Sequence, residues 1–241
     1  MHHLLTGRSA LHLHLRHFRP DLPHIRLALG LGLPASIEQA TRTFSSLLLM
    51  SLAASFGTVG LASYGVGTRL LFFWFTPIIG LGIATAIAVG QNIGAGHPER
   101  AEQAARIAAW LGFAALTLVG VAHLPFVPWI MAALAPGETE VVEHASRFAY
   151  IYLPFLGINA VTQVLMGTFR GAGSTQQSMA LSLMQQWVFQ LPIASTLALA
   201  TPLGLSGIWL CYPLGNIGGT ILGLLWFRYG RWRRRLLQDP A

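Results

Sequence analysis

Glu38 is the residue of this sequence with the clearest capacity for chemistry, because it is an acid in a long apolar segment. It follows Pro34 by four residues and precedes Arg42 by four, so a helix would carry all three on one face. Pro34 also frees a backbone carbonyl and favours a kink beside the acid. A carboxylate in such a segment is costly and usually faces a cavity or a charged partner. Two interpretations stay open: Glu38 binds an ion or a proton, or it only neutralises Arg42.

Amide side chains form a second set of candidates, and they recur at helical spacing. Asn159 and Gln163 are four residues apart, as are Gln186 and Gln190, so each pair would share a helix face. Amides within apolar segments either hold helices together or line a polar cavity, and both interpretations remain open. The candidates for lining a cavity with Glu38 are Gln39, Asn159, Gln163 and Gln190.

Motifs of soluble enzymes are missing from the sequence, which contains no Walker A loop, no nucleophile elbow and no metalloprotease helix. Cys211 is the single cysteine, so the chain can form neither an internal disulfide nor a zinc site of cysteines. His14 and His17 could share a helix face, but a juxtamembrane segment is the favoured interpretation there. We therefore predict no enzyme activity, no catalytic or metal-ligating residue and no cofactor.

The elements that would position these residues are membrane-spanning helices. The chain is 54% hydrophobic and 10% charged, whereas soluble domains carry roughly 25% charged residues. This composition predicts an all-α membrane protein, a bundle of six transmembrane helices with small residues such as Gly80 and Gly82 at close helix contacts. Glu38 would then lie roughly 17 Å into the first span, near the middle of the bilayer. The predicted spans are residues 27–56, 61–89, 104–130, 148–169, 179–200 and 204–227.

The arginines indicate how these helices are oriented. The net charge of +7 alone would suggest nucleic-acid binding, but the arginines gather at the two ends and in short loops, so we predict none. With a cytoplasmic N-terminus, twelve of the fifteen lie in cytoplasmic segments, as the positive-inside rule requires. Arg42 and Arg69 lie within spans and are interpreted as structural or pairing residues. We predict a basic cytoplasmic linker (1–26), a six-helix lobe (27–228) and an Arg-rich cytoplasmic tail (229–241).

Three motifs lie at the ends of predicted spans. Residues 31–39 open the first span, residues 89–101 close the second, and residues 169–175 close the fourth. Together and in this order they resemble the multidrug and toxic compound extrusion (MATE) family, over residues 26–228. The motif positions are Gly90, Gln91, Asn92, Gly94, Gly96, Arg170, Gly171 and Gly173.

The resemblance implies a function as well as a fold. MATE proteins consist of two six-helix lobes with a cavity between them, and this chain resembles the C-terminal lobe. The resemblance implies an antiporter of the plasma membrane, which in bacteria is the inner membrane. A small cationic or amphipathic compound, a drug or a toxin, would leave as Na⁺ or H⁺ enters, by rocking of the lobes.

A lobe of this kind needs a partner to complete its cavity. The partner would be an N-terminal lobe, from the same gene or a separate chain, or a second copy in a homodimer. The alternative is a membrane subunit or a degenerate half-transporter that does not transport and only assembles with a partner lobe.

Two departures from the MATE pattern change the expected site. Some members carry a second acid in the helix that matches residues 148–169, where this sequence has neither Asp nor Glu. The pattern is closer to the DinF-like branch, in which a first-lobe acid is implicated in coupling, so coupling would not rest on Glu38 alone. Ser174 stands where the family's Arg-Gly-Ala-Gly-Asp-Thr string has Asp, and we expect Ser174 to cap the following helix.

Overall fold

The structure, a computed structural model, describes residues 21–229 and residue 232. Contacts divide the chain into two compact units, residues 1–33 and residues 34–241. The second unit contains all the predicted site residues. Most of the predicted linker and tail lies outside the described residues.

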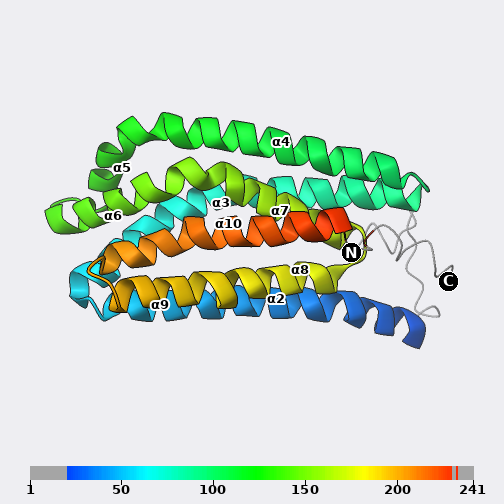
Figure 1. The fold of residues 1–241 in the computed structure, drawn as a ribbon, viewed down its shortest axis with the longest axis horizontal. Coiled ribbons are helices and arrows are strands. Elements are labelled where there is room, and N and C mark those ends of the chain that lie inside the picture. The colour runs from blue at the N-terminus through cyan, green and yellow to red at the C-terminus, as the bar shows by residue number, and fades with distance from the viewer. Residues whose placement is uncertain (1–20, 230–231, 233–241) are drawn as a thin grey trace, which may run out of the picture. The chain divides into compact units, whose positions relative to one another are not determined.

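Helices make up nearly all of the part of the chain that is described, and no strand occurs there, which confirms the all-α prediction. They are α2 (Leu22–Ala54), α3 (Gly57–Gly94), α4 (Pro98–His123), η2 (Leu124–Phe126), α5 (Val127–Leu134), α6 (Thr139–Tyr152), η3 (Leu153–Phe155), α7 (Leu156–Gly171), α8 (Thr175–Leu183), the π-helix η4 (Met184–Gln190), α9 (Leu191–Leu199) and α10 (Leu205–Tyr229). The short elements η2, η3 and η4 join their neighbours end to end. Within residues 21–229 this leaves six rods, in the order of the six predicted spans (Figure 1).

The fourth rod begins earlier than the predicted residue 148. Helix α6 starts at Thr139, and Glu140 lies in its first turn, where a negative charge complements the helix dipole. One turn later, Glu143 and Arg147 form an ion pair of 2.6 Å between side chains four residues apart. Local charge pairing therefore extends the helix beyond the apolar stretch that the hydropathy pattern marks.

Four of the rods are long and apolar enough to cross a membrane, within the residues described: Gly57–Gly94, Pro98–Leu134, Thr139–Gly171 and Leu205–Tyr229. The other two are α2 and the rod of α8, η4 and α9. They are more polar because α2 carries Glu38 and Arg42 and η4 carries three glutamines. Large apolar side chains such as Trp110 and Trp129 are exposed, as a surface in contact with lipid requires.

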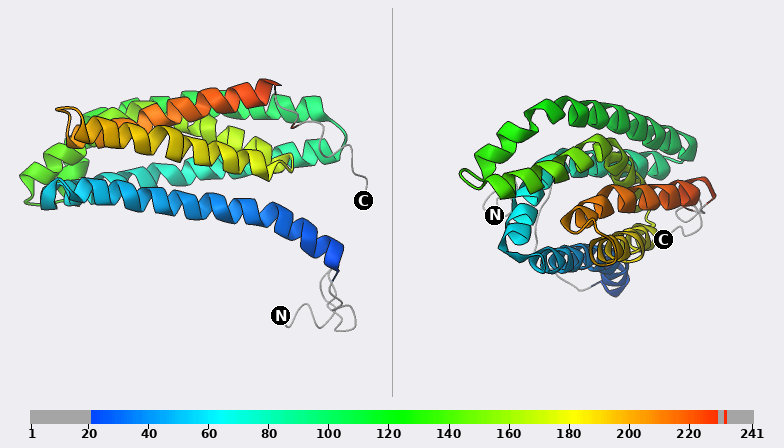
Figure 2. Two further views of the ribbon diagram at one scale, coloured as in Figure 1. Left: turned by 60° about the horizontal axis from the view of Figure 1, so that its bottom comes forward. Right: turned by 60° about the vertical axis from the view of Figure 1, so that its left-hand side comes forward.

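Helix α7 is the centre of the bundle and packs against α3, α4 and α10 (Figure 1). Its contact with α3 is close because both helices carry glycine there: a Cβ added to Gly167 would lie 2.2 Å from the carbonyl oxygen of Gly82. The predicted packing role is thus confirmed for Gly82, whereas Gly80 has open space around its Cβ position. The rod of α8, η4 and α9 runs along α10 (Figure 2).

The two Gly-x-Gly motifs end helices α3 and α7 in the same way. Gly96 (φ 76°) and Gly173 (φ 70°) adopt the left-handed conformation that glycine tolerates best. The amide of Gly96 donates to Ile93 O, and that of Gly173 to Arg170 O, at 2.9 and 3.0 Å. In each case the next residue donates to the carbonyl five positions back, which completes a Schellman cap.

Ser174 does not act as the expected side-chain cap of α8. It occupies the residue before the helix, but its side chain makes no capping hydrogen bond. Its hydroxyl is buried without a partner among the described residues. The Schellman cap uses the backbone amide of Ser174 instead, at 2.8 Å from Phe169 O. The cap at the end of α7, and not a cap at the start of α8, therefore sets the position of Ser174.

Candidate functional site

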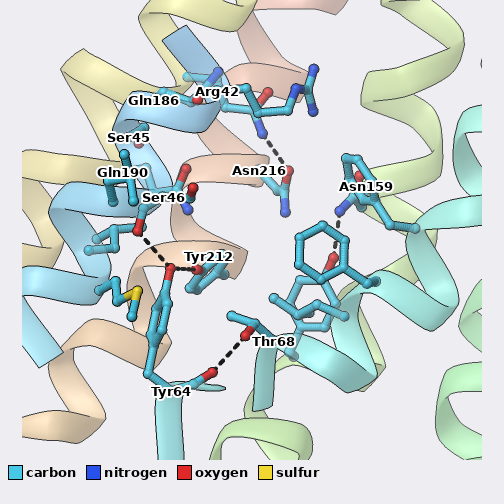
Figure 3. A pocket seen from close by; sticks show the side chains of 18 of the residues that line it. Arg42, Ser45, Ser46, Tyr64, Thr68, Asn159, Gln186, Gln190, Tyr212 and Asn216 are labelled. Carbon is cyan, nitrogen blue, oxygen red and sulfur yellow. Dashed lines mark hydrogen bonds between the residues drawn. The ribbon is translucent and has the colours of Figure 1, made fainter. Parts of the chain in front are cut away.

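A cavity of about 300 Å³ lies within the second unit, between α2, α3, the α6–α7 rod, η4 and α10 (Figure 3). Its wall combines a guanidinium, hydroxyls, amides and aromatic or aliphatic side chains. The residues that line it are Arg42, Ser45, Ser46, Leu47, Leu49, Met50, Tyr64, Thr68, Leu71, Phe72, Phe75, Tyr152, Asn159, Gln163, Gln185, Gln186, Gln190, Tyr212 and Asn216.

Amide groups from three rods form one side of this wall. The side-chain nitrogen of Asn159 donates to the hydroxyl of Tyr152 at 2.6 Å. Across the rods, the Gln185 nitrogen donates to the Asn216 oxygen at 2.5 Å. Because these bonds are internal to the wall, they fix the directions of the amides before any ligand arrives.

The π-helix η4 is the reason that three glutamines reach the cavity from one short segment. A π-helix bonds residues five apart, so it turns less per residue than an α-helix. Gln185, Gln186 and Gln190 consequently all line the wall. Gln186 is anchored by a 2.8 Å bond from its side-chain nitrogen to the Ser182 hydroxyl. Helical spacing predicts the pair Gln186 and Gln190, but not the addition of Gln185.

Aromatic hydroxyls close another side of the cavity. The hydroxyls of Tyr64 and Tyr212 lie 3.0 Å apart, and that of Tyr64 also donates to Ser46 O at 3.2 Å (Figure 3). Tyr64 stacks on the fully buried Trp209, with ring centroids 6.1 Å apart. The tyrosines therefore belong to the core as well as to the cavity, which makes this side rigid.

Glu38 lies behind the wall, in an ion-pair cluster that joins three helices. One carboxylate oxygen accepts hydrogen bonds from Arg170 of α7 and, at 3.3 Å, from Arg42. The other oxygen accepts from the hydroxyl of Ser178 in α8 at 3.0 Å. Arg170 also donates through its Nε to Ser178 at 3.1 Å. The Glu38 side chain is 6% exposed, so this cluster compensates a buried charge.

The partners of Glu38 correct its expected depth. Arg170 lies in the last turn of α7 and Ser178 in the first turns of α8. Glu38 is therefore level with the connection between these helices, and not halfway along them as its distance from residue 27 suggests. The contacts with Arg170 and Ser178 place Glu38 at this end of α7, and counting residues from the start of a span does not take such long-range contacts into account.

The structure brings together part of the predicted site. Asn159, Gln163 and Gln190 line the cavity as expected, and Arg42 joins them. Glu38 is not part of the wall, and it meets the cavity only through Arg42. Glu38 shares the buried face of α2 with Ser45 and Leu49, which do line the cavity, but it lies nearer the start of the helix, where it meets Arg170 and Ser178 instead.

Two other predicted residues stay outside the site. Gln39 follows Glu38 directly, so it points away from the buried face and is exposed. Arg69 is exposed on α3 and does not line the cavity. Sequence reasoning missed Arg170 as a partner of Glu38, because 132 residues separate them. It left the role of Tyr64 and Tyr152 open between membrane-interface anchors and ligand contacts, and it did not name Tyr212, because aromatic content alone does not distinguish these roles.

Two further motif positions, Gly90 and Gly171, serve the packing of α3 on α7. A Cβ on Gly90 would lie 3.2 Å from Gly171 O, and one on Gly171 would lie 2.3 Å from Ala86 O. Asn92 bonds its own helix, donating to Ala88 O at 2.8 Å. The second and third motifs therefore meet in space, beside the Glu38 cluster that Arg170 joins.

Comparison with known proteins finds a family model and several relatives that match this chain. A family model described as MatE matches residues 34–196. The "Probable multidrug resistance protein YoeA" of Bacillus subtilis is 28% identical over 199 residues, which cover 82% of this chain and 42% of the relative. The "Probable multidrug resistance protein NorM" of Bradyrhizobium diazoefficiens is 28% identical over 227 residues, 91% of this chain and 47% of the relative. The chain thus spans about half the length of the curated relatives it matches.

Solved structures share the fold. The structure described as "Crystal structure of MATE in complex with MaL6" matches with a TM-score of 0.86 and 25% identity, over 94% of this chain and 51% of that one. The "Outward-facing conformation of a multidrug resistance MATE family transporter of the MOP superfamily" matches with a TM-score of 0.79 and 20% identity, over 85% of this chain and 45% of that one. In both, the helices of this chain correspond to about half of the solved chain.

Proposed function

Because this chain belongs to the MatE family, we propose that it forms the cavity-bearing half of an antiporter that exports drugs or toxic organic compounds as Na⁺ or H⁺ enters. The observation that carries this proposal is the cavity. Amide, hydroxyl and aromatic groups converge on about 300 Å³ inside a bundle of largely apolar helices. Small-molecule sites typically combine apolar walls with a few fixed polar groups in this way.

Glu38 has a positioning role in this proposal. Its carboxylate has three donors, from Arg42, Arg170 and Ser178, so its charge is already compensated. The cluster ties α2 to α7 and α8 at one end of the cavity. A Glu38→Gln variant separates the roles: if Glu38 coupled transport, the variant would insert and bind compound but lose its dependence on the ion gradient. A positioning role predicts a less stable variant whose residual transport still follows the gradient.

We further propose that the chain works with a second half of similar size, which is an N-terminal lobe from the same gene, a separate chain or a second copy. The proposal is supported by relatives about twice the length of the matched region. The setting would be the plasma membrane, with both termini in the cytoplasm, as the arginine distribution predicts.

Transport by the full chain in proteoliposomes tests the proposed function. Fluorescent amphipathic compounds of positive, negative and no net charge are offered under a Na⁺ or a proton gradient. At least one compound should move against the ion, faster than in protein-free liposomes. If none moves under either gradient, with or without an added partner half, antiport is contradicted and the non-transporting subunit is favoured.

A matched pair of variants on α2 shows whether the cavity is the transport site. Ser46 lines the cavity, so Ser46→Trp should block the space and stop transport. Ser51 lies on the same helix, exposed and outside the wall, so Ser51→Trp should leave transport within about twofold of the wild type. Equal losses in both variants would contradict the assignment of this cavity.

A further inference from the structure

We propose that the cavity selects amphipathic organic anions, and that Arg42 binds their carboxylate, sulfonate or phosphate group. The inference rests on the proposed function only in taking the cavity as the compound-binding surface. It narrows the cationic or amphipathic compound implied by the MATE resemblance to an amphipathic compound of negative charge.

The charge of the cavity wall is the first observation. Among the described residues that line it, Arg42 is the one charged side chain, and the other polar groups are neutral amides and hydroxyls. The nearest carboxylate, Glu38, lies behind Arg42 and not in the wall. A cation in the cavity would meet a guanidinium with no facing carboxylate, whereas an anion would be attracted to it.

The ion pairs around Glu38 leave positive charge in excess. The same carboxylate oxygen accepts bonds from both Arg170 and Arg42, so one negative charge serves two positive ones. Arg170 makes the closer contact, while Arg42 keeps one bond of 3.3 Å. A guanidinium carries five N–H donors. Within the described part of the chain Arg42 makes this single hydrogen bond, so most of its donors remain available to a ligand.

Ser45 supplies an independent observation in the same part of the wall. It lies one turn beyond Arg42 on α2, lines the cavity and is 2% exposed (Figure 3). Its hydroxyl is buried with no hydrogen-bond partner among the residues described. A buried hydroxyl without an acceptor is unfavourable. An anionic oxygen held at Arg42 would supply that acceptor.

Aromatic side chains define the rest of the ligand. The Arg42 guanidinium carbon lies 5.5 Å from the centre of the Phe75 ring, and Phe72 and Leu71 line the wall beside it. An anionic group at Arg42 would therefore leave an attached apolar body against aromatic rings. A small bicyclic aromatic acid has this combination of charge, shape and size.

Binding of two probes of opposite charge tests the inference without any variant. The full chain in detergent is titrated calorimetrically with 2-naphthoate and with 2-naphthyltrimethylammonium, which share one ring system. We expect the anion to bind at least about tenfold more tightly, as one charge-assisted contact supplies. Equal affinities, tighter binding of the ammonium, or no binding of either probe at millimolar concentration would overturn the inference.

Variants with opposite expected effects locate the site. Arg42→Gln should weaken naphthoate binding about tenfold, and Arg42→Lys should retain most of it. Glu38→Gln removes the competing carboxylate and should tighten naphthoate binding, which a misfolded protein could not do. The matched control is Arg147→Gln, because Arg147 also pairs with a glutamate four residues earlier but lies outside the cavity. Unchanged naphthoate affinity in Arg42→Gln would overturn the role of Arg42.

Lipid composition identifies the source of the anion. If the site holds a soluble amphipath, naphthoate should bind equally in nanodiscs of phosphatidylcholine with and without phosphatidylglycerol. Weaker binding with phosphatidylglycerol, abolished by Arg42→Gln, would identify a lipid headgroup at the same anion site. Anion selectivity without transport would contradict the proposed function alone, and transport of cations without anion binding would contradict this inference alone.

Discussion

At the scale of single residues, the cluster of Glu38, Arg170 and Ser178 is a closed set of contacts in which each member touches the other two. Such a set holds the directions of its side chains better than an isolated pair, because moving one member breaks two bonds. Arg42 completes the neutralisation from the cavity side. Removing one partner leaves the buried carboxylate short of donors, and that cost exceeds what the intact pair contributes.

Arg170→Gln is therefore expected to lower the stability of the purified protein by about 2 kcal/mol. The figure lies below the roughly 3–5 kcal/mol of a fully buried pair because the Arg170 side chain is 32% exposed. The measurement is the apparent free energy of unfolding in detergent, with Arg147→Gln as the control for loss of an exposed arginine. Equal effects of the two variants would contradict the role assigned to the cluster.

A double-mutant cycle with Glu38→Gln tests the same contact. If the two side chains interact directly, the double variant should be more stable than the sum of the single losses predicts, by about 1 kcal/mol or more. Strictly additive losses would show that each residue acts through separate contacts.

At the scale of elements, the ends of α3 and α7 depend on glycine conformations more than on side chains. Gly96 has φ 76° and no neighbouring atom within 4 Å of its Cβ position, so its requirement is purely one of backbone. Gly167 is the opposite case, since its backbone is ordinary and its surroundings are crowded. Substitutions at Gly96 and Gly167 therefore measure two costs separately: the cost of a strained backbone conformation and the cost of steric overlap between helices.

Gly96→Ala should destabilise the protein by about 1 kcal/mol, the cost of a left-handed conformation for an L-residue. Gly94→Ala is the matched control, because Gly94 lies in the same motif with open space and without a positive φ. Thermal unfolding should show a loss for the first variant only. A similar loss of stability in both variants would indicate that the left-handed conformation of Gly96 is not the reason that glycine is needed in this motif.

Gly167→Ala should cost about 1–3 kcal/mol, because its Cβ would meet backbone that cannot rotate away. Gly80→Ala, where nothing lies within 4 Å, should be neutral or slightly stabilising in the same measurement. If Gly167→Ala is tolerated as well as Gly80→Ala, helices α3 and α7 do not pack as closely as the structure indicates.

At the scale of the whole molecule, successive rods run in opposite directions, and this predicts on which side of the membrane each connection lies. His97 and Glu138 lie in successive connections, at opposite ends of the rod formed by α4, η2 and α5. Single cysteines at these two positions should be modified by an impermeant maleimide from opposite sides of the membrane, His97→Cys from the cytoplasm. The native Cys211 is fully buried and should stay unlabelled. Labelling of both positions from one side would contradict the predicted topology.

The sequence allows the prediction of features that depend on neighbours along one helix. Asn159 and Gln163 are an example, because a spacing of four is enough to place both on one face. Contacts between distant segments cannot be obtained in this way: Glu38 reaches Arg170 only because α2 and α7 pack together. The π-helix that brings Gln185 to the cavity cannot be predicted either, because no residue type indicates a backbone hydrogen bond between residues five positions apart.

The single charge of the cavity wall has an electrical consequence. With Arg42 unoccupied the wall carries one positive charge, and with an anion bound the site is neutral. A membrane potential of 100 mV does about 2.3 kcal/mol of work on each elementary charge that crosses the whole bilayer. If the cavity alternates between the two sides, a voltage that is negative inside favours the inward movement of the anion-free form, which carries the positive charge of Arg42 and, in the proposed antiport, the entering Na⁺ or H⁺. The anion-loaded form has a neutral site and moves without regard to voltage, so the return of the anion-free form would be the step that carries current.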